Sequence, residues 1–168
     1  MIKNIILIGM TGAGKTTVGK ALSGKYSLPF YDTDELITRY TGMPPSEIVK
    51  AHGSDYFLDA QDKVIAELDL ESSVISTGGS VATSQKAIES LKKTGVIVYL
   101  KVDFEILDQR LDKSRPLARN PQKSFHDLFL EREILFNKYA DITCYCREKS
   151  PDEIAIWIKN KFDEVTKC

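Results

Sequence analysis

The chain has 168 residues, of which 42% are hydrophobic and 28% are charged, a size and composition typical of one globular domain. Its 23 lysines and arginines nearly balance its 24 acidic residues, which does not favour a nucleic-acid-binding protein, and no apolar run approaches the roughly 20 residues that span a membrane. The three cysteines are too few for a disulfide framework. We therefore expect a cytoplasmic protein with reduced thiols and with neither nucleic acid nor membrane as a partner.

The first predicted element is a strand over Ile5–Ile8, whose unbroken apolar run is typical of a strand buried on both faces of a parallel sheet. A glycine-rich loop follows it. After the loop, Val18, Leu22 and Tyr26 recur at a spacing of four and predict a helix that can lie on the sheet. The chain therefore begins with a strand, a loop and a helix.

That loop, Gly9–Thr16, matches the G-x-x-x-x-G-K-[ST] phosphate-binding pattern without a mismatch. Glycines allow several backbone N–H groups to curl around a phosphate, and the N-terminus of the following helix favours a negative charge there. Lys15 is expected to contact the β and γ phosphates, and the Thr16 hydroxyl to bind Mg²⁺. The residues expected to bind the nucleotide are Gly12, Ala13, Gly14, Lys15, Thr16 and Thr17.

A second strand is predicted at Pro29–Tyr31, and two acids, Asp32 and Asp34, follow it. Ligands collect at the carboxyl ends of strands in open α/β sheets, so both carboxylates are expected to face the phosphate loop. One could orient a metal-bound water and the other an attacking hydroxyl. The alternative is structural, with Asp32 ending the strand and Asp34 capping a helix over Glu35–Tyr40.

The long stretch that follows is mostly helical by pattern. It is opened by Pro44-Pro45-Ser46 and broken at His52-Gly53, and it predicts a small subdomain over about 33–70 that could build a substrate site. A third strand at Ser73–Ile75 then leads to Gly78 and Gly79. These paired glycines permit close backbone approach to a ligand at the same sheet edge, or they form a plain turn.

The remaining elements alternate regularly. Strands are predicted at Val96–Leu100 and Ile142–Tyr145, and helices at Asp103–Leu111 and Pro151–Val165. Between them, the polar segment 112–124 resembles a flexible lid. Five strands alternating with helices predict a three-layer α/β fold in a single domain, 1–168.

Five motifs in this order and spacing make the chain resemble the shikimate kinases over almost its whole length: Gly9–Thr16, Asp32-Thr33-Asp34, Thr77-Gly78-Gly79, Arg115-Pro116-Leu117, and Arg132 followed by Tyr139-Ala140-Asp141. The resemblance implies a P-loop kinase fold like that of the nucleoside monophosphate kinases, with a five-stranded parallel sheet of order 2-3-1-4-5. It implies transfer of the γ-phosphate of ATP to the 3-hydroxyl of shikimate, with Mg²⁺, in aromatic amino-acid biosynthesis. We expect a monomer.

The resemblance also implies roles for individual residues. Lys15, Asp34 and Arg115 would be catalytic, with Asp34 orienting the acceptor hydroxyl and Arg115 reaching the transferring phosphate from the lid. Thr16 and Asp32 would hold Mg²⁺, directly or through water. The remaining residues would bind the two substrates: Arg110 the adenine, Gly78 and Gly79 the acceptor through their backbone, and Arg132 the acceptor's carboxylate.

Three positions depart from the family pattern. Leu58 replaces the arginine that binds the acceptor's carboxylate, Gln61 replaces the acid that supports that arginine, and Ser80 replaces the third glycine after Gly78 and Gly79. Two alternatives therefore remain: a kinase of the same build that acts on another small hydroxy-metabolite, and a non-catalytic nucleotide-binding regulatory homologue. The presence of an aspartate at position 34 argues against the second, because a binding module would not need it.

Overall fold

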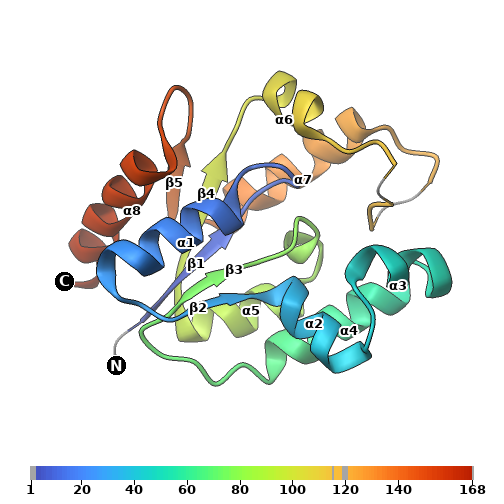
Figure 1. Cartoon of the computed structure of the whole chain (residues 1–168), viewed down its shortest axis with the longest axis horizontal. Coiled ribbons are helices and arrows are strands. Elements are labelled where there is room, and N and C mark those ends of the chain that lie inside the picture. Colours follow the sequence, from blue (N-terminus) through green and yellow to red (C-terminus); the bar gives the residue numbers. More distant parts are fainter. Residues whose placement is uncertain (1–2, 115, 119–120, 168) are drawn as a thin grey trace.

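A computed structural model describes residues 3–114, 116–118 and 121–167. In this part of the chain five strands form one parallel sheet in the order β2-β3-β1-β4-β5 (Figure 1). The strands are β1 (Asn4–Ile8), β2 (Phe30–Asp32), β3 (Val74–Ser76), β4 (Gly95–Lys101) and β5 (Ile142–Tyr145). The α/β fold and the strand order are confirmed, and each end of every predicted strand lies within one residue of the observed end.

Helices cover both faces of the sheet. In the described residues they are α1 (Lys15–Tyr26), α2 (Thr33–Thr41), α3 (Pro45–His52), α4 (Ser54–Ala66), α5 (Gln85–Thr94), α6 (Phe104–Arg110), α7 (Phe125–Tyr139) and α8 (Pro151–Thr166), with a 3₁₀ turn, η1, at Val81–Thr83. Figure 1 shows α1 and α8 on one face, and α5 and α7 behind the sheet on the other. None of the described helices is long and apolar enough to cross a membrane.

The centre of the sheet is β1, which pairs with β3 on one side and β4 on the other. All five of its residues are buried, as expected for a parallel strand covered on both faces. In its one polar member, Asn4, both side-chain polar atoms are hydrogen-bonded: Nδ2 donates to the Leu70 carbonyl at 2.6 Å and Oδ1 accepts from the Ser73 N–H at 3.0 Å. The amide therefore ties the start of β1 to the entry of β3.

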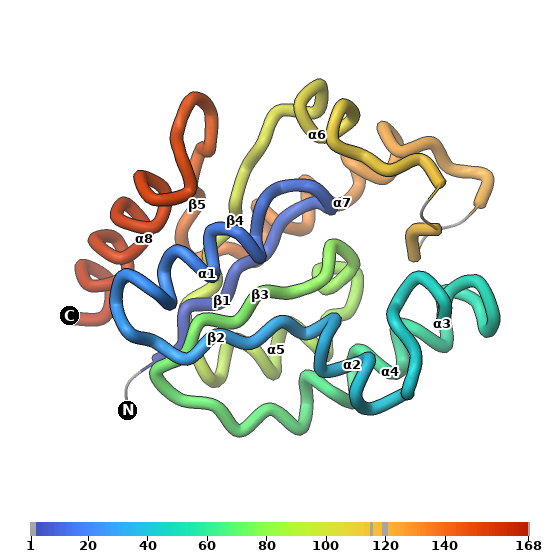
Figure 2. Tube along the Cα trace, in the orientation of Figure 1, coloured from blue at the N-terminus to red at the C-terminus, as the bar shows by residue number. Residues whose placement is uncertain are grey.

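Helices α2, α3 and α4 pack around an apolar cluster of their own, separate from the main core. Its buried members are Ile37, Ile48, Phe57, Ala60 and Val64. Leu58 and Ala118 are partly buried against it, so the segment between α6 and α7 contacts this group of helices. Figure 2 shows that segment facing α3 beyond the carboxyl ends of the strands.

Candidate active site

Three cavities adjoin one another at the carboxyl edge of the sheet. The first, of about 580 Å³, lies between the phosphate loop, α6 and the start of α8. The second, of about 240 Å³, lies over the loop and the start of α2, and the third, of about 50 Å³, lies between α3, α4 and α7. The second and third share four lining residues, Thr11, Asp34, Gly78 and Gly79. A group bound in one cavity therefore borders a group bound in the next.

The phosphate loop adopts the backbone that its sequence predicts. Gly12 and Gly14 have φ values of 86° and 91°, which side chains rarely allow, and α1 begins at Lys15 directly after them. The Lys15 side chain is 8% exposed, and its Nζ donates to the Gly9 carbonyl at 2.7 Å and the Met10 carbonyl at 2.8 Å. The loop thus holds an ammonium group against its own carbonyls at the wall of the second cavity.

A hydroxyl and a carboxylate meet in the second cavity. Thr16 Oγ1 donates to Asp32 Oδ2 at 2.8 Å, and Asp32 Oδ1 accepts the backbone N–H of Asp34 at 2.9 Å. Asp32 is therefore the N-cap of α2, which begins at Thr33. The sequence-based alternative, in which Asp34 caps a helix that begins at Glu35, is wrong in the identity of the cap. Asp34 lies inside the helix, and its carboxylate lines both the second and the third cavity.

The paired glycines pack closely against residues shared by the second and third cavities. A Cβ on Gly78 would lie 2.9 Å from Asp34 Oδ1, and a Cβ on Gly79 would lie 2.7 Å from Thr11 Oγ1 and 3.0 Å from the Thr11 nitrogen. A side chain at position 79 would press on the Thr11 backbone, whereas one at position 78 would meet the end of the Asp34 side chain, which would have to move. A plain surface turn would not place position 79 against a backbone atom.

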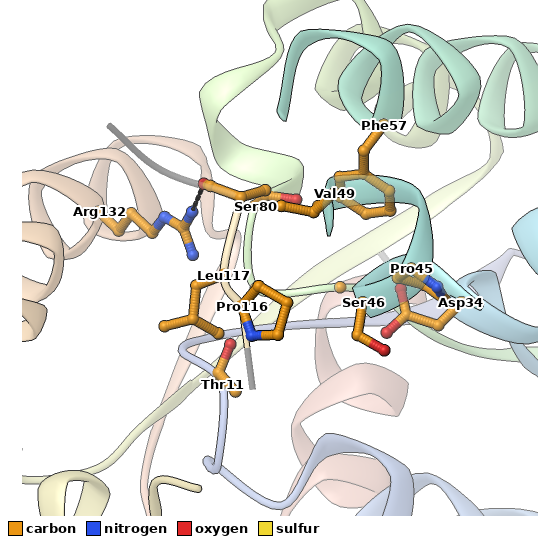
Figure 3. A pocket seen from close by; sticks show the side chains of 13 residues that line it. Thr11, Asp34, Pro45, Ser46, Val49, Phe57, Ser80, Pro116, Leu117 and Arg132 are labelled. Carbon is orange, nitrogen blue, oxygen red and sulfur yellow. Dashed lines mark hydrogen bonds between the residues drawn. The ribbon is translucent and has the colours of Figure 1, made fainter. Parts of the chain in front are cut away.

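The third cavity is lined by the phosphate loop, helices α2, α3, α4 and α7, the turn after β3 and the segment between α6 and α7 (Figure 3). Apart from the four residues shared with the second cavity, its described lining is Pro45, Ser46, Val49, Phe57, Ser80, Pro116, Leu117, Ala118 and Arg132. Arg132 is 2% exposed, and its Nη2 donates to the Ala118 carbonyl at 2.7 Å. Among these described lining residues it is the one cation, so an anionic group in the cavity would be attracted to this guanidinium.

Several lining residues were not predicted from the sequence, among them Thr11, Val49 and Phe57. Pro45 and Ser46 belong to a motif that signalled only the start of a helix. Arg115 lies outside the described residues. Of the three departures, Leu58 packs in the apolar cluster of α2–α4, whereas Ser80 donates from Oγ to Gln61 Oε1 at 3.0 Å.

The first cavity is the most apolar of the three regions and is bordered by Arg110. Arg110 Nη1 donates to the Gly12 carbonyl at 3.0 Å, which holds the guanidinium beside the phosphate loop. The loop between β5 and α8 contributes Cys146, which the sequence did not mark as a site residue. A hydrogen bond with Cys144 and burial raise the pKa of the Cys146 thiol, so it stays protonated and is a poor nucleophile.

Comparison with known proteins gives one consistent result. The family model for shikimate kinase matches residues 11–163. A shikimate kinase of Caldanaerobacter subterraneus is 37% identical over 92% of this chain and 92% of its own, and one of Clostridium botulinum strain Loch Maree is 40% identical over 85% and 88%. Among solved structures, shikimate kinase from Acinetobacter baumannii in complex with shikimate superposes with a TM-score of 0.85 at 28% identity, over 99% of this chain and 94% of that one. The Aquifex aeolicus enzyme gives 0.84 at 34% identity, over 97% and 98%.

Proposed function

The chain belongs to the shikimate kinase family and is a phosphotransferase that acts on a hydroxyl group, and we propose that it transfers the γ-phosphate of ATP to the 3-hydroxyl of shikimate. The observation that carries the proposal is the sharing of Asp34, Gly78 and Gly79 by the second and third cavities. An acceptor hydroxyl at Asp34 would lie next to phosphates held by the loop, as an in-line transfer requires.

The nucleotide would occupy the first two cavities. Arg110 and the apolar wall of the first cavity would bind the adenine, and the loop N–H groups with Lys15 would hold the β and γ phosphates. When the nucleotide binds, the Lys15 ammonium would leave the two loop carbonyls and contact phosphate oxygens instead. Its positive charge would then stabilise the phosphoryl group that is transferred. We also assign Arg115 to the transferring phosphate.

The oxygen donors of Thr16 and Asp32 fit a hard cation, because they lie 2.8 Å apart on the wall of the second cavity. We propose that these two residues hold Mg²⁺, which when bound would neutralise phosphate charge. Since Asp32 also caps α2, the same carboxylate would fix the position of Asp34 two residues later. Asp34 would then accept a hydrogen bond from the acceptor hydroxyl and orient its oxygen toward the phosphate.

Arg132 is proposed to bind the carboxylate of shikimate. Its guanidinium is buried on the wall of the third cavity, where a charge-assisted hydrogen bond is strong. Residues about 33–70 would form the acceptor subdomain and about 112–124 the lid.

A second candidate acceptor is another small hydroxylated metabolite. It is favoured by the presence of one cation, Arg132, among the described residues of the third cavity, and by the contact of that cation with the Ala118 carbonyl. An acceptor without a carboxylate would need no second cation there.

The test is an ATP-consumption assay with shikimate, quinate and small polyols, run beside a Lys15→Met variant whose folding is checked by a melting curve. We expect shikimate to give the highest kcat/KM, and Lys15→Met to abolish turnover. Preference for a polyol would favour the second candidate. Unchanged turnover in a folded Lys15→Met protein would remove the assignment of Lys15, and no turnover with any acceptor would indicate a non-catalytic homologue.

A further inference from the structure

Two buried polar side chains meet at the wall of the third cavity without contributing to the nucleotide site. Ser80 lines the cavity and is 4% exposed, and Gln61 of α4 stands behind it and is 0% exposed. Ser80 Oγ donates to Gln61 Oε1 at 3.0 Å. The Ser80 backbone is also fixed, since its carbonyl accepts from Thr83 Oγ1 at 2.6 Å and from the Thr83 N–H at 3.0 Å.

The direction of this hydrogen bond limits what Ser80 can bind. A serine hydroxyl has one hydrogen and two lone pairs, and an amide oxygen can only accept, so the hydrogen of Ser80 is committed to Gln61. The lone pairs of Ser80 Oγ remain for a group in the cavity. Such a group must donate a hydrogen bond, as a hydroxyl does and as a carboxylate or a ketone cannot.

The pair lies close to the proposed site of transfer. A Cβ placed on Gly78 would lie 3.7 Å from Gln61 Oε1 and 2.9 Å from Asp34 Oδ1. These distances place Asp34 Oδ1 and Gln61 Oε1 at most 6.6 Å apart, and Ser80 Oγ is 3.0 Å from Gln61 Oε1, so a small acceptor can span from Asp34 to Ser80. Two hydroxyls on neighbouring ring carbons satisfy this arrangement.

Stability does not explain why the pair is present. Within the described part of the chain, Gln61 Nε2 is buried and has no hydrogen-bond partner, and an unpaired buried amide destabilises a fold. A side chain of similar size without the amide would pack at this position at no such cost.

We propose that Ser80 is a specificity-determining residue, which accepts a hydrogen bond from the acceptor hydroxyl next to the one that is phosphorylated. Gln61 is its positioning residue and holds the Ser80 hydroxyl in the accepting orientation. The inference rests on the proposed function and adds a requirement for a vicinal diol. With shikimate as the acceptor, the hydroxyl bound by Ser80 is the one at carbon 4.

The experiment compares kcat/KM for shikimate, 4-deoxyshikimate and 5-deoxyshikimate in the wild-type protein, Ser80→Ala, Gln61→Met and the double variant. We expect Ser80→Ala to raise KM for shikimate and 5-deoxyshikimate about 3- to 10-fold, the effect of one neutral hydrogen bond, with little change in kcat. It should leave 4-deoxyshikimate unaffected. Gln61→Met should give a smaller rise in KM for shikimate and 5-deoxyshikimate. In the Ser80→Ala background it should give no further rise, because Gln61 acts through Ser80.

Ser73→Ala is the matched control, because it removes a buried serine hydroxyl that donates to the Glu71 carbonyl at the opposite end of β3. It should leave all three acceptor ratios unchanged. An equal loss with all three acceptors in Ser80→Ala would indicate a packing role, and no loss with shikimate would remove Ser80 from recognition; either result overturns the inference.

If wild-type protein does not phosphorylate shikimate, the proposed function fails by itself. The same variants are then assayed with the polyol that is accepted and with its vicinal monodeoxy analogue, and the same dependence on Ser80 is expected. If no hydroxylated acceptor is phosphorylated, both proposals fail.

Discussion

Asp34 is the residue whose position most directly links the two proposed substrates, because it lines the second and third cavities together. We predict that Asp34→Asn lowers kcat about 100-fold or more, since the amide orients the acceptor hydroxyl poorly and cannot take its proton. ATP affinity should change little, and α2 should remain folded because its cap is Asp32. Calorimetric ATP binding measured beside kcat checks this. Matched losses in both would assign Asp34 to the metal or to the fold.

Leu58 and Gln61 lie one helical turn apart on α4, so they can be changed as a pair. We predict that Leu58→Arg with Gln61→Glu raises kcat/KM for shikimate about 10-fold or more, mainly through KM, because a charge-assisted contact to the carboxylate is worth about 1.5–3 kcal/mol. Leu58→Arg alone should destabilise the protein, since it places an unpaired charge in the apolar cluster around Phe57.

The measurements are kcat/KM for shikimate and melting temperature in the parent, the two single variants and the double variant. A parent that already uses shikimate efficiently, and a double variant with no gain, would mean that another group supplies the contact.

The sequence predicts the placement of the candidate site residues best where a motif fixes local geometry. The meeting of Thr16 and Asp32 could be predicted from local motifs, because the phosphate loop and the end of β2 lie at the same carboxyl edge of the parallel sheet, although β3 lies between β1 and β2. Val49 and Phe57 carry no such local signal. They line the third cavity because α3 and α4 fold over it, and their apolar character is equally typical of a core residue.

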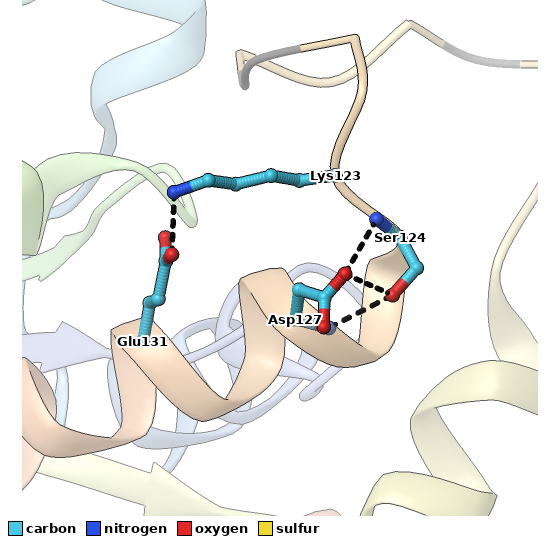
Figure 4. A network of polar contacts seen from close by, with 4 residues as sticks. All are labelled: Lys123, Ser124, Asp127 and Glu131. Carbon is cyan, nitrogen blue, oxygen red and sulfur yellow. Dashed lines mark hydrogen bonds and ion pairs between the residues drawn. The ribbon is translucent and has the colours of Figure 1, made fainter.

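At the scale of elements, α7 begins with a capping box formed by Ser124 and Asp127, and the Asp127 carboxyl makes its stability depend on pH. Ser124 Oγ accepts the Asp127 N–H at 3.0 Å, and Asp127 Oδ2 accepts the Ser124 N–H at 3.0 Å, with the ion pair of Lys123 and Glu131 beside them (Figure 4). The hydrogen bonds from the Ser124 side chain and backbone lower the pKa of Asp127. Because the folded-state pKa lies below the unfolded one, the stabilisation is present above the unfolded value, about 3.9, and is lost as the pH falls through the folded value.

We therefore predict that Asp127→Asn lowers the melting temperature at neutral pH and flattens its decline at acidic pH. Melting curves of the variant and the wild type from pH 7 to pH 3 check this, with Glu131→Gln as a control for an exposed acid outside the cap. If the melting temperatures of Asp127→Asn and wild type fall in parallel as the pH decreases, this cap does not link stability to pH.

The helices missed by sequence reasoning differ in why they were missed. In α5, Ala87, Ile88 and Leu91 form a buried stripe behind the cap Ser84, a signal that was available. In α7, apolar residues occur on the exposed side as well, where Leu130 is 47% and Ile134 70% exposed. The 3.6-residue period is blurred there, so periodicity alone could not define the helix.

At the scale of the whole molecule, the segment proposed as the lid forms part of the wall of the third cavity. At about 50 Å³ this cavity is well below the few hundred Å³ typical of ligand sites, and Pro116, Leu117 and Ala118 form part of its wall. An acceptor bound as proposed would have to displace them to enter, and the contact of Ala118 with Arg132 would have to break for the guanidinium to bind its carboxylate.

We predict that ATP and acceptor together slow amide exchange in the described lid residues 112–114, 117 and 118, because the two ligands would close the lid over a filled site. Exchange in β1 and β4 should be unaffected and serves as the internal control. The measurement is hydrogen–deuterium exchange of the protein alone, with an ATP analogue, with shikimate, and with both. Equal exchange in the lid under all four conditions would contradict closure.

The position of β1 at the centre of the sheet has a consequence for synthesis on the ribosome. This strand is made before either of its neighbours, yet it pairs with β3 and with β4, which ends at Lys101. At about 5–20 residues per second, its apolar run waits roughly 5–20 s for the second partner. Until β4 has emerged, the edge of β1 that pairs with it is an open template for other chains, even after β3 has covered the opposite edge, so we expect the growing polypeptide to be most prone to aggregation in that interval.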